Sequence, residues 1–507
     1  MIGREVTRGL VLAAGLAALL AGGCVSTRAE YFERLRRRRL SSFARWEERR
    51  PGDRTKPALD GPLNLEEAIR VALAQNTQIQ AVLQEKERAR GRVVGAYSEA
   101  LPRVDLSATY TRLDKVQTVD LGVQTFQIGD EDNYAWQVEI TQPLYKGGMM
   151  LIAQRAARIF SYLSDERVRG TVEATIFAVA TAYYDVKLAE RLIHVQEAAL
   201  ESAQKHLEDV NSRRRHGTAT EYDVLRARVD VSNIRADLIE QRNRRDRGLT
   251  RLLRAMGASQ RSHVELITDM RYGPVRPDFT ESVKDALANR ADIYQAELTA
   301  DLQAEAVKEA YSRYWPRLDA YAWRRWAKPD PHQASRIEWG DQWQAGLRLS
   351  WPLFDGFARE GRIIEQEAEL RRTEILLADT EEQAVQEVQN VILELQNARE
   401  LVQSQRLNLQ RADRALALVQ AGYREGVNTE VELLDARAAL TRARGLYYQA
   451  LHRHTIARID LRRARGILGP PPGSASEPQQ AVAPGQVVDA VSGQTKEPEQ
   501  ADRAGGP

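Results

Sequence analysis

The chain has 507 residues and a net charge of only +2, with 28% charged and 7% aromatic residues. A nucleic-acid-binding protein would concentrate a basic excess on one face, whereas here Lys and Arg are interleaved with Asp and Glu. The composition therefore argues against a nucleic-acid partner and favours long, solvated helices.

The N-terminus has the features of an export signal. Arg4 and Arg8 precede an apolar run over residues 9–21, and small residues then lead to Cys24, the only cysteine. The run is too short for a membrane-spanning helix, which needs about 20 apolar residues. We therefore expect residues 1–23 to be a signal peptide.

Cys24 stands where bacterial lipoproteins are cleaved and acylated, and residues 21–24 resemble a lipobox. Because Val25 rather than Asp follows, we expect a lipoprotein with palmitate-type chains on Cys24, anchored in outer-membrane lipid and extending into the periplasm. The alternative is an incidental cysteine near an ordinary cleavage site. Residues 24–62 then form the lipidated N-terminus and a linker, whose run Arg36–Arg39 either contacts anionic lipid head groups or is simply solvated.

Two long helices dominate the chain. Residues 147–212 and 355–422 contain no proline, and each predicts a helix of about 100 Å. In the second helix, apolar residues alternate in steps of three and four, as in a coiled-coil seam. The seam consists of Val388, Val391, Leu395, Ala398, Val402, Leu409, Ala412, Leu416 and Val419.

The two halves of the chain repeat one unit. Pro143 and Pro352 precede the two rods, and matching turns follow at Gly217 and Gly426. We therefore divide the chain into a first repeat, 63–274, and a second repeat, 275–468, each a helix-strand-strand-helix unit. The Pro- and Gly-rich tail, 469–507, is expected to be disordered.

Four segments alternate apolar and polar residues with a period of two: about 103–113, 133–143, 317–326 and 342–352. Each has about the ten residues of a tilted membrane-spanning strand. Four strands cannot close a barrel, and an open edge in a membrane would leave backbone groups unpaired. Three copies would supply twelve strands, so we predict a homotrimer.

Four shorter helices are predicted, over 63–99, 219–257, 278–312 and 429–466. The first of them is capped by Asn64. Two of them end to end match one rod, and we expect 219–257 to stack with 278–312, and 429–466 with 63–99. The break at 258–277 should then lie at mid-height.

The repeated units and paired turns together resemble the TolC-like outer-membrane efflux proteins, more particularly their lipoprotein branch. The resemblance covers about residues 63–468. It implies a mainly α fold with a β-barrel part, in which a trimeric twelve-stranded outer-membrane barrel continues into a long α-helical periplasmic barrel. It also implies that the chain is the outer-membrane channel of a tripartite efflux or type I secretion system, a passive exit duct working with a periplasmic adaptor protein and an inner-membrane pump.

The resemblance places the periplasmic entrance constriction at the second turn. The matching positions hold Glu432 and Asp435, whose i, i+3 spacing puts both carboxylates on one helix face. The alternative is a solvated acidic face. Asp223 and Tyr423 match positions that bond across the closed entrance, but Asn428 replaces a basic residue of the family, which implies an entrance that opens more easily.

The same resemblance assigns adaptor contacts to the turns. These residues are Gly217, Thr218, Thr220, Gly426, Val427 and Thr429. The simpler alternative is that the glycines only provide the positive backbone angles of a tight turn. Both interpretations are compatible.

The sequence contains no recognisable catalytic, cofactor or metal motif. His452 and His454 are two apart on a predicted helix and therefore point apart. We expect no enzyme activity, no cofactor and no metal. The competing interpretation is a lipid-tethered periplasmic coiled-coil structural protein with no pore.

Overall fold

The computed structural model describes residues 32–41, 59–120, 125–333 and 336–472. The chain divides into two units, Met1–Asp60 with Arg261–His263, and Gly61–Gln260 with Val264–Pro507. The signal peptide, Cys24 and residues 473–507 of the predicted tail lie outside the described residues.

The smaller unit contains a largely exposed helix over residues 32–41, inside the segment that we expected to be linker. This helix carries the run Arg36–Arg39. Elsewhere in the same unit, the Leu59 N–H donates to Ser262 Oγ at 3.1 Å. The remaining features belong to the larger unit.

Two helices of 67 residues each dominate the larger unit, and at 1.5 Å per residue each is about 100 Å long. Six shorter helices accompany them. In chain order the helices are α3 (Leu65–Gln75), α4 (Thr77–Ser98), α5 (Met149–Arg215), α6 (Glu221–Met256), α7 (Phe279–Asn289), α8 (Ala291–Ser312), α9 (Ala358–Arg424) and α10 (Glu430–Ala464).

Two of the predicted helices are broken. Residues 63–99 form α3 and α4, separated at Asn76, and residues 278–312 form α7 and α8, separated at Arg290. Both residues have an extended backbone, with ψ of 128° and 130°, which ends a helical hydrogen-bond ladder. Asn76 then caps the next helix, because its Oδ1 accepts from the N–H of Gln78 at 2.8 Å.

The predicted end-to-end pairs are wrong, because the junctions join different partners. Asn76 Nδ2 donates to the Ala255 carbonyl at 2.7 Å, so α6 continues into α4. Arg290 Nη1 donates to the Ala464 carbonyl at 3.4 Å, so α10 continues into α8. After α6 ends, the chain crosses to the column that α10 and α8 share, where α8 begins.

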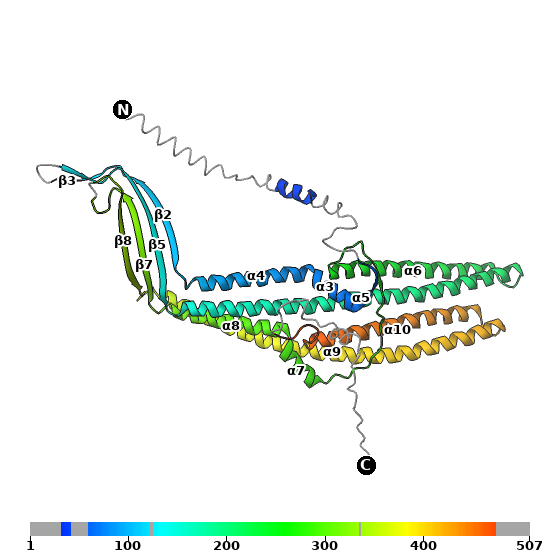
Figure 1. Cartoon of the computed structure of the whole chain (residues 1–507). Helices are drawn as coiled ribbons and strands as arrows, with labels where there is room; N and C mark the ends of the chain where they lie inside the picture. Colours follow the sequence, from blue (N-terminus) through cyan, green and yellow to red (C-terminus); the bar gives the residue numbers. More distant parts are fainter. Residues whose placement is uncertain (1–31, 42–58, 121–124, 334–335, 473–507) are drawn as a thin grey trace, which may run out of the picture. The chain divides into compact units, whose positions relative to one another are not determined.

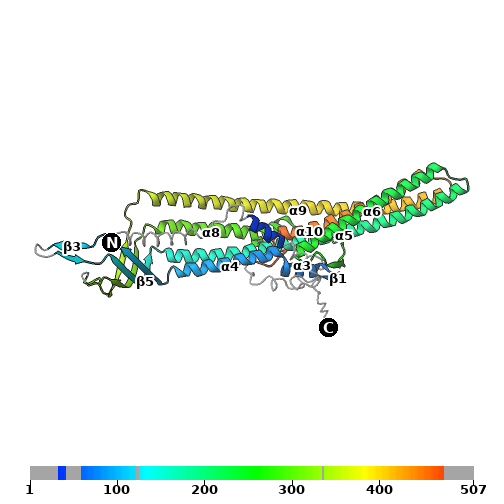
Figure 2. The ribbon, with the colours of Figure 1, turned by 90° about the horizontal axis from the view of Figure 1, so that it is seen from above.

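The helices therefore form a layer of four columns. The α6–α4 column packs against α5, α5 packs against both α10 and α8, and α9 packs against both α10 and α8. Figure 2 shows α4 and α9 on opposite sides of this layer, with α5 and α8 between them. The hairpin turns α5–α6 and α9–α10 lie at the end of the columns away from the strands (Figure 1).

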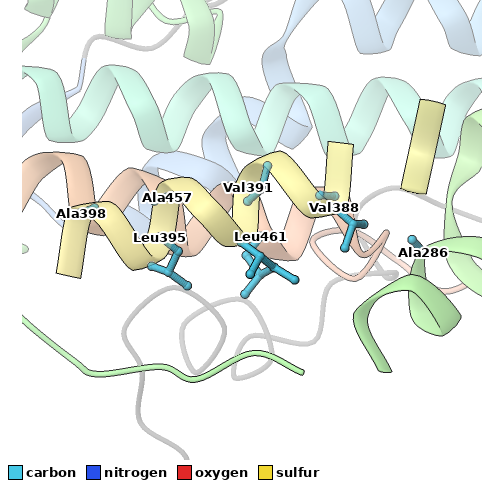
Figure 3. Packing of buried hydrophobic residues seen from close by; sticks show 9 residues of the cluster. Ala286, Val388, Val391, Leu395, Ala398, Ala457 and Leu461 are labelled. Atoms are coloured by element: carbon cyan, nitrogen blue, oxygen red, sulfur yellow. The ribbon is translucent and has the colours of Figure 1, made fainter. Parts of the chain in front are cut away.

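The predicted seam of α9 is buried in its middle part. Val388, Val391, Leu395, Ala398 and Val402 are buried, whereas the seam positions from Leu409 to Val419 are half-buried. A core cluster joins Val388, Val391, Leu395 and Ala398 to Ala457 and Leu461 of α10 and to Ala286 of α7 (Figure 3). Ala464 of α10 also belongs to this cluster. The coiled-coil interpretation is confirmed for this stretch, and the packing loosens toward the turn.

Four long strands form one antiparallel sheet in the order β2-β5-β7-β8. They are β2 (Arg103–Arg112), β5 (Asp132–Lys146), β7 (Arg317–Lys328) and β8 (Gly340–Ser350), and they overlap the four alternating segments. One face is largely apolar: Leu106 lies opposite Val138, and Trp136 stacks on Trp326 with ring centroids 4.0 Å apart. Two hairpin strands that we did not predict, β3 (Gln117–Asp120) and β4 (Thr125–Ile128), pair with each other beyond β2.

The segment between α6 and α7 lies beside the middle of α5, as predicted. The Thr268 N–H donates to Tyr183 Oη at 2.8 Å, and Lys187 Nζ donates to the Leu266 carbonyl at 2.9 Å. The short strands β1 (Asp60–Leu63) and β6 (His263–Leu266), whose first residues belong to the smaller unit, pair with each other. Among the described residues, no helix combines the length and apolar composition that a bilayer span requires.

The beginning of the predicted tail is also placed. Pro470 is buried, and a side chain at Gly469 would collide with Glu173 of α5. Residues 469–472 are therefore part of the packed structure.

Candidate functional site at the hairpin turns

Each hairpin turn contains a glycine with a left-handed backbone. Gly217 has a φ of 78° and Gly426 a φ of 76°, and a Cβ at either position would meet nothing within 4 Å. Backbone bonds close the turns: the Thr218 N–H donates to the Arg213 carbonyl at 2.9 Å, and the Val427 N–H to the Gly422 carbonyl at 2.8 Å. Glycine is therefore needed here for its positive φ and not for close packing.

A capping box begins the returning helix in both hairpins. The Asp223 carboxylate accepts from the Thr220 N–H at 2.8 Å and from its Oγ1 at 2.7 Å. Glu432 Oε2 accepts from the Thr429 N–H at 2.7 Å and from its Oγ1 at 3.1 Å. The patterns Thr-x-x-Asp and Thr-x-x-Glu are the local sequence signal of such a box.

These hydrogen bonds stabilise the ionised form of both carboxylates. The backbone N–H of Thr220 is the largest cause of a lowered pKa at Asp223, and that of Thr429 has the same effect on the pKa of Glu432. Asp435 lies on the same helix as Glu432 and is also exposed, so α10 carries two carboxylates near its turn.

Asn428 supports the second turn from inside. Its Nδ2 donates to Glu432 Oε2 at 3.1 Å, and its side chain lies so close to Gly422 that a Cβ there would overlap with it. A glycine in the last turn of α9 is therefore what allows Asn428 to reach Glu432.

Tyr423 does not bond to Asp223 within the described chain. Its ring instead lies under the Arg213 guanidinium, with 4.8 Å between Arg213 Cζ and the ring centroid. The His206 ring packs on its edge at 6.3 Å. Tyr423 thus joins α9 of the second hairpin to α5 of the first.

A buried polar contact that we did not foresee joins the hairpins at the same level. His206 Nε2 lies 3.1 Å from Glu430 Oε1, although the two residues are 224 positions apart. Burial, together with the nearby Arg437, lowers the pKa of His206, and burial also lowers the pKa of Arg437. No local pattern indicates a contact over such a separation.

The turns also expose apolar side chains. Val427 is 80% exposed, and Tyr222, at the start of α6, is 69% exposed. Thr218 and Thr429 flank these residues. In the described part of the chain, no three His, Cys, Asp or Glu side chains come together as a metal site would require. The turns therefore offer a mixed apolar and polar surface suited to contact with another protein.

A family model and individual relatives of known proteins match this chain and agree with one another. The family model described as "Outer membrane efflux protein" matches residues 68–258 and 282–467. Outer membrane protein TolC of Escherichia coli K12 is 21% identical over 420 residues, which cover 80% of this chain and 82% of TolC. The alkaline protease secretion protein AprF of Pseudomonas aeruginosa is 23% identical, covering 80% of this chain and 85% of AprF.

The fold agrees with a solved channel structure. The crystal structure of the Campylobacter jejuni CmeC outer membrane channel superposes with a TM-score of 0.69 at 15% identity. The match covers 79% of this chain and 85% of CmeC. At this identity the likeness concerns the fold alone.

Proposed function

Because the chain belongs to the outer membrane efflux protein family, we propose that it is the exit duct of a tripartite efflux or type I secretion system. In this role it conducts substrate passively from an inner-membrane pump across the periplasm and the outer membrane. A lipid on Cys24 anchors the N-terminus. The duct is a homotrimer, in which a twelve-stranded barrel continues into a tunnel of helices.

The observation that carries the proposal is the pair of open edges. Strands β2 and β8 are the outer strands of an antiparallel sheet of four, so they run in opposite directions. β8 of one copy can therefore pair antiparallel with β2 of the next, which closes the sheet without leaving an edge. β2 follows α4 and β8 precedes α9, so the open edges of the sheet and of the helical layer coincide.

The repeat organisation fits this proposal. The units 63–274 and 275–468 each supply two of the four long strands and one of the two 67-residue helices. A pore needs such strands beside each rod, whereas a lipid-tethered coiled coil does not. The tether is therefore the less favoured alternative.

We place the entrance constriction at the turns. Glu432 and Asp435 of each copy form its acidic lining and favour cations. Asp223, Tyr423 and Asn428 lie beside it. The adaptor contacts the turn residues Gly217, Thr218, Thr220, Gly426, Val427 and Thr429, where exposed apolar groups are available.

The test is single-channel conductance of the purified protein in a planar bilayer. Glu432→Ala would remove both a charge and a helix cap, so the better variant is Glu432→Gln with Asp435→Asn, since Gln retains the capping box. We expect small cation-selective openings from the wild type and a loss of selectivity in the double variant. Glu374→Gln, an exposed position on α9 far from the turns, is the matched control.

The outcomes separate the proposals. Conductance with unchanged selectivity in the double variant would support the duct but contradict the acidic entrance. No conductance from any variant, with extraction as a monomer or dimer, would favour the tether.

A further inference from the structure

The helix α10 carries a stripe of three basic side chains beside its core. His454, Arg458 and Arg462 follow one another at intervals of four residues, which puts them on one face of the helix. Ala457 and Leu461, each one position before an arginine of the stripe, belong to the core cluster shared with α9 (Figure 3). The stripe therefore lies at the border of the core. His454 is fully buried there, and the two arginines are half-buried.

The segment between β6 and α7 covers part of this stripe. The Tyr272 ring packs against the His454 ring, with centroids 4.9 Å apart. A Cβ at Gly273 would lie 3.0 Å from Arg458 Nη1, so the guanidinium rests against the backbone of the segment. Tyr272 also reaches α9, because its Oη accepts from Gln403 Nε2 at 3.4 Å. The basic side chains are thus held between α10 and this segment, with α9 beside them.

The stripe has no counter-charge within the described residues. Both ring nitrogens of His454 and the Nε of Arg462 are enclosed without a hydrogen-bond partner in this part of the chain. Burial lowers the pKa of Arg458, that of Arg462 to about 10 and that of His454 to about 4. Other cations add to this effect, since Arg458 and Arg399 act on His454, and Arg465 and Arg458 act on Arg462.

The carboxylates of the surrounding elements do not balance this charge. Several of them form ion pairs with other arginines: Asp269 with Arg191, Asp285 with Arg465, Glu394 with Arg453 and Asp460 with Arg463. Glu265 and Glu400 are exposed, and neither is among the charges that shift the pKa values of the stripe. A partly buried charge without a partner destabilises the folded state, so an anion bound at the stripe would stabilise it.

The donors of the stripe match a phosphate group. Arg458 and Arg462 are one helical turn apart, about 6 Å along the axis, so one anion can contact both. A guanidinium presents planar, forked N–H donors to oxygen anions. Neutral His454 has one further N–H to donate. A phosphate group offers three acceptor oxygens and up to two negative charges, whereas a carboxylate offers two oxygens and one charge.

We propose that Arg458 and Arg462 bind a phosphate group, free or as a phosphate monoester, beside the segment that contains Tyr272 and Gly273. The bound anion balances the charge of the stripe and holds this segment to α10. The site lies near the middle of the rods, since the neighbouring His452 forms an ion pair with Asp185 of α5 at 3.0 Å. It does not depend on the proposed duct, because binding is a property of the protein alone.

Calorimetric titration of the purified protein with inorganic phosphate, in chloride buffer at constant ionic strength, tests the site. We expect saturable binding of one phosphate per chain. Arg458→Gln combined with Arg462→Gln should weaken binding by at least about tenfold, because two charged hydrogen-bond donors are lost. Arg442→Gln is the matched control, since Arg442 is an exposed arginine of α10 about 30 Å from Arg462. It should bind phosphate as the wild type does.

Titration with glycerol 3-phosphate distinguishes the two sources of the group. Binding of both ligands would support a site open to phosphate monoesters, and binding of inorganic phosphate alone would support a site for the free ion. No saturable binding of inorganic phosphate to the wild type would overturn the proposal, even if the double variant fails to fold. Equal binding by the wild type and the double variant would overturn it as well.

Thermal unfolding provides a second readout that a purely structural role of the arginines would not produce. In chloride buffer the double variant should unfold at the same temperature as the wild type or higher, because it lacks the unbalanced charge. Phosphate should raise the unfolding temperature of the wild type and of Arg442→Gln more than that of the double variant. A double variant that unfolds at a lower temperature in chloride would contradict the reasoning, since the arginines would then stabilise the fold without an anion.

Discussion

Asn76 is the side chain whose replacement tests the column architecture most directly. It is 7% exposed and makes two kinds of bond at the junction of α6 and α4. Its Oδ1 caps α4 by accepting from the N–H groups of Gln78 and Ile79, and its Nδ2 donates to the Ala255 carbonyl at the end of α6.

The two functions can be separated by substitution. Asn76→Ala removes a cap worth about 1 kcal/mol and leaves a partly buried carbonyl without its donor, at about 1–3 kcal/mol. We therefore expect a loss of about 2–4 kcal/mol in the free energy of unfolding. Asn76→Ser keeps a capping oxygen but is too short to reach Ala255, so it should cost only the second contribution.

The assay is guanidinium unfolding followed by helical circular dichroism, at a fixed protein concentration because assembly contributes to stability. Asn64→Ala is the matched control. Asn64 caps α3 by accepting from the Glu67 N–H at 2.7 Å and has no hydrogen bond to another helix. If Asn76→Ala costs no more than Asn64→Ala, the bond to Ala255 does not join the columns and the reasoning is refuted.

Three further predictions concern buried charge and the entrance. Burial, only partly offset by Arg169, raises the pKa of Glu173 from 4.5 to about 7. The native state then binds more protons than the unfolded state between these pH values, so this group lowers stability by up to about 3 kcal/mol as pH rises from about 4.5 to 7. Glu173→Gln should abolish that slope in unfolding measured across this range, and an unchanged slope would contradict the assignment. His454 should act in the opposite direction, because burial lowers its pKa from 6.5 to about 4. Stability should fall by up to about 3 kcal/mol as pH falls from about 6.5 to 4, and His454→Leu should remove this acid loss. Asn428→Arg should restore a basic group at the entrance and lower leak conductance in a planar bilayer, whereas equal leak would show that Asn428 does not weaken the closed state.

Much of the turn region was accessible from the sequence. The glycines, the threonine caps and the carboxylates of the turns depend on residues within five positions of one another, and their geometry follows from short-range backbone chemistry. The role of Glu432 as a cap was also predictable from the Thr-x-x-Glu pattern, although the resemblance to the family concerned only its charge. Tyr423 is different, since its contact with Arg213 depends on how two hairpins approach each other.

The sequence by itself determined the two rods, the buried seam of α9 and the four long strands, because periodicity and proline spacing act locally. Only the tertiary structure decided which short helix continues which column. Asn76 meets Ala255 and Arg290 meets Ala464 across separations of 179 and 174 residues. Helix length does not distinguish the two pairings, because α4 and α8 both have 22 residues and α6 and α10 have 36 and 35. The choice between them therefore depends on side chains that meet only after the columns have packed, and no local pattern encodes it.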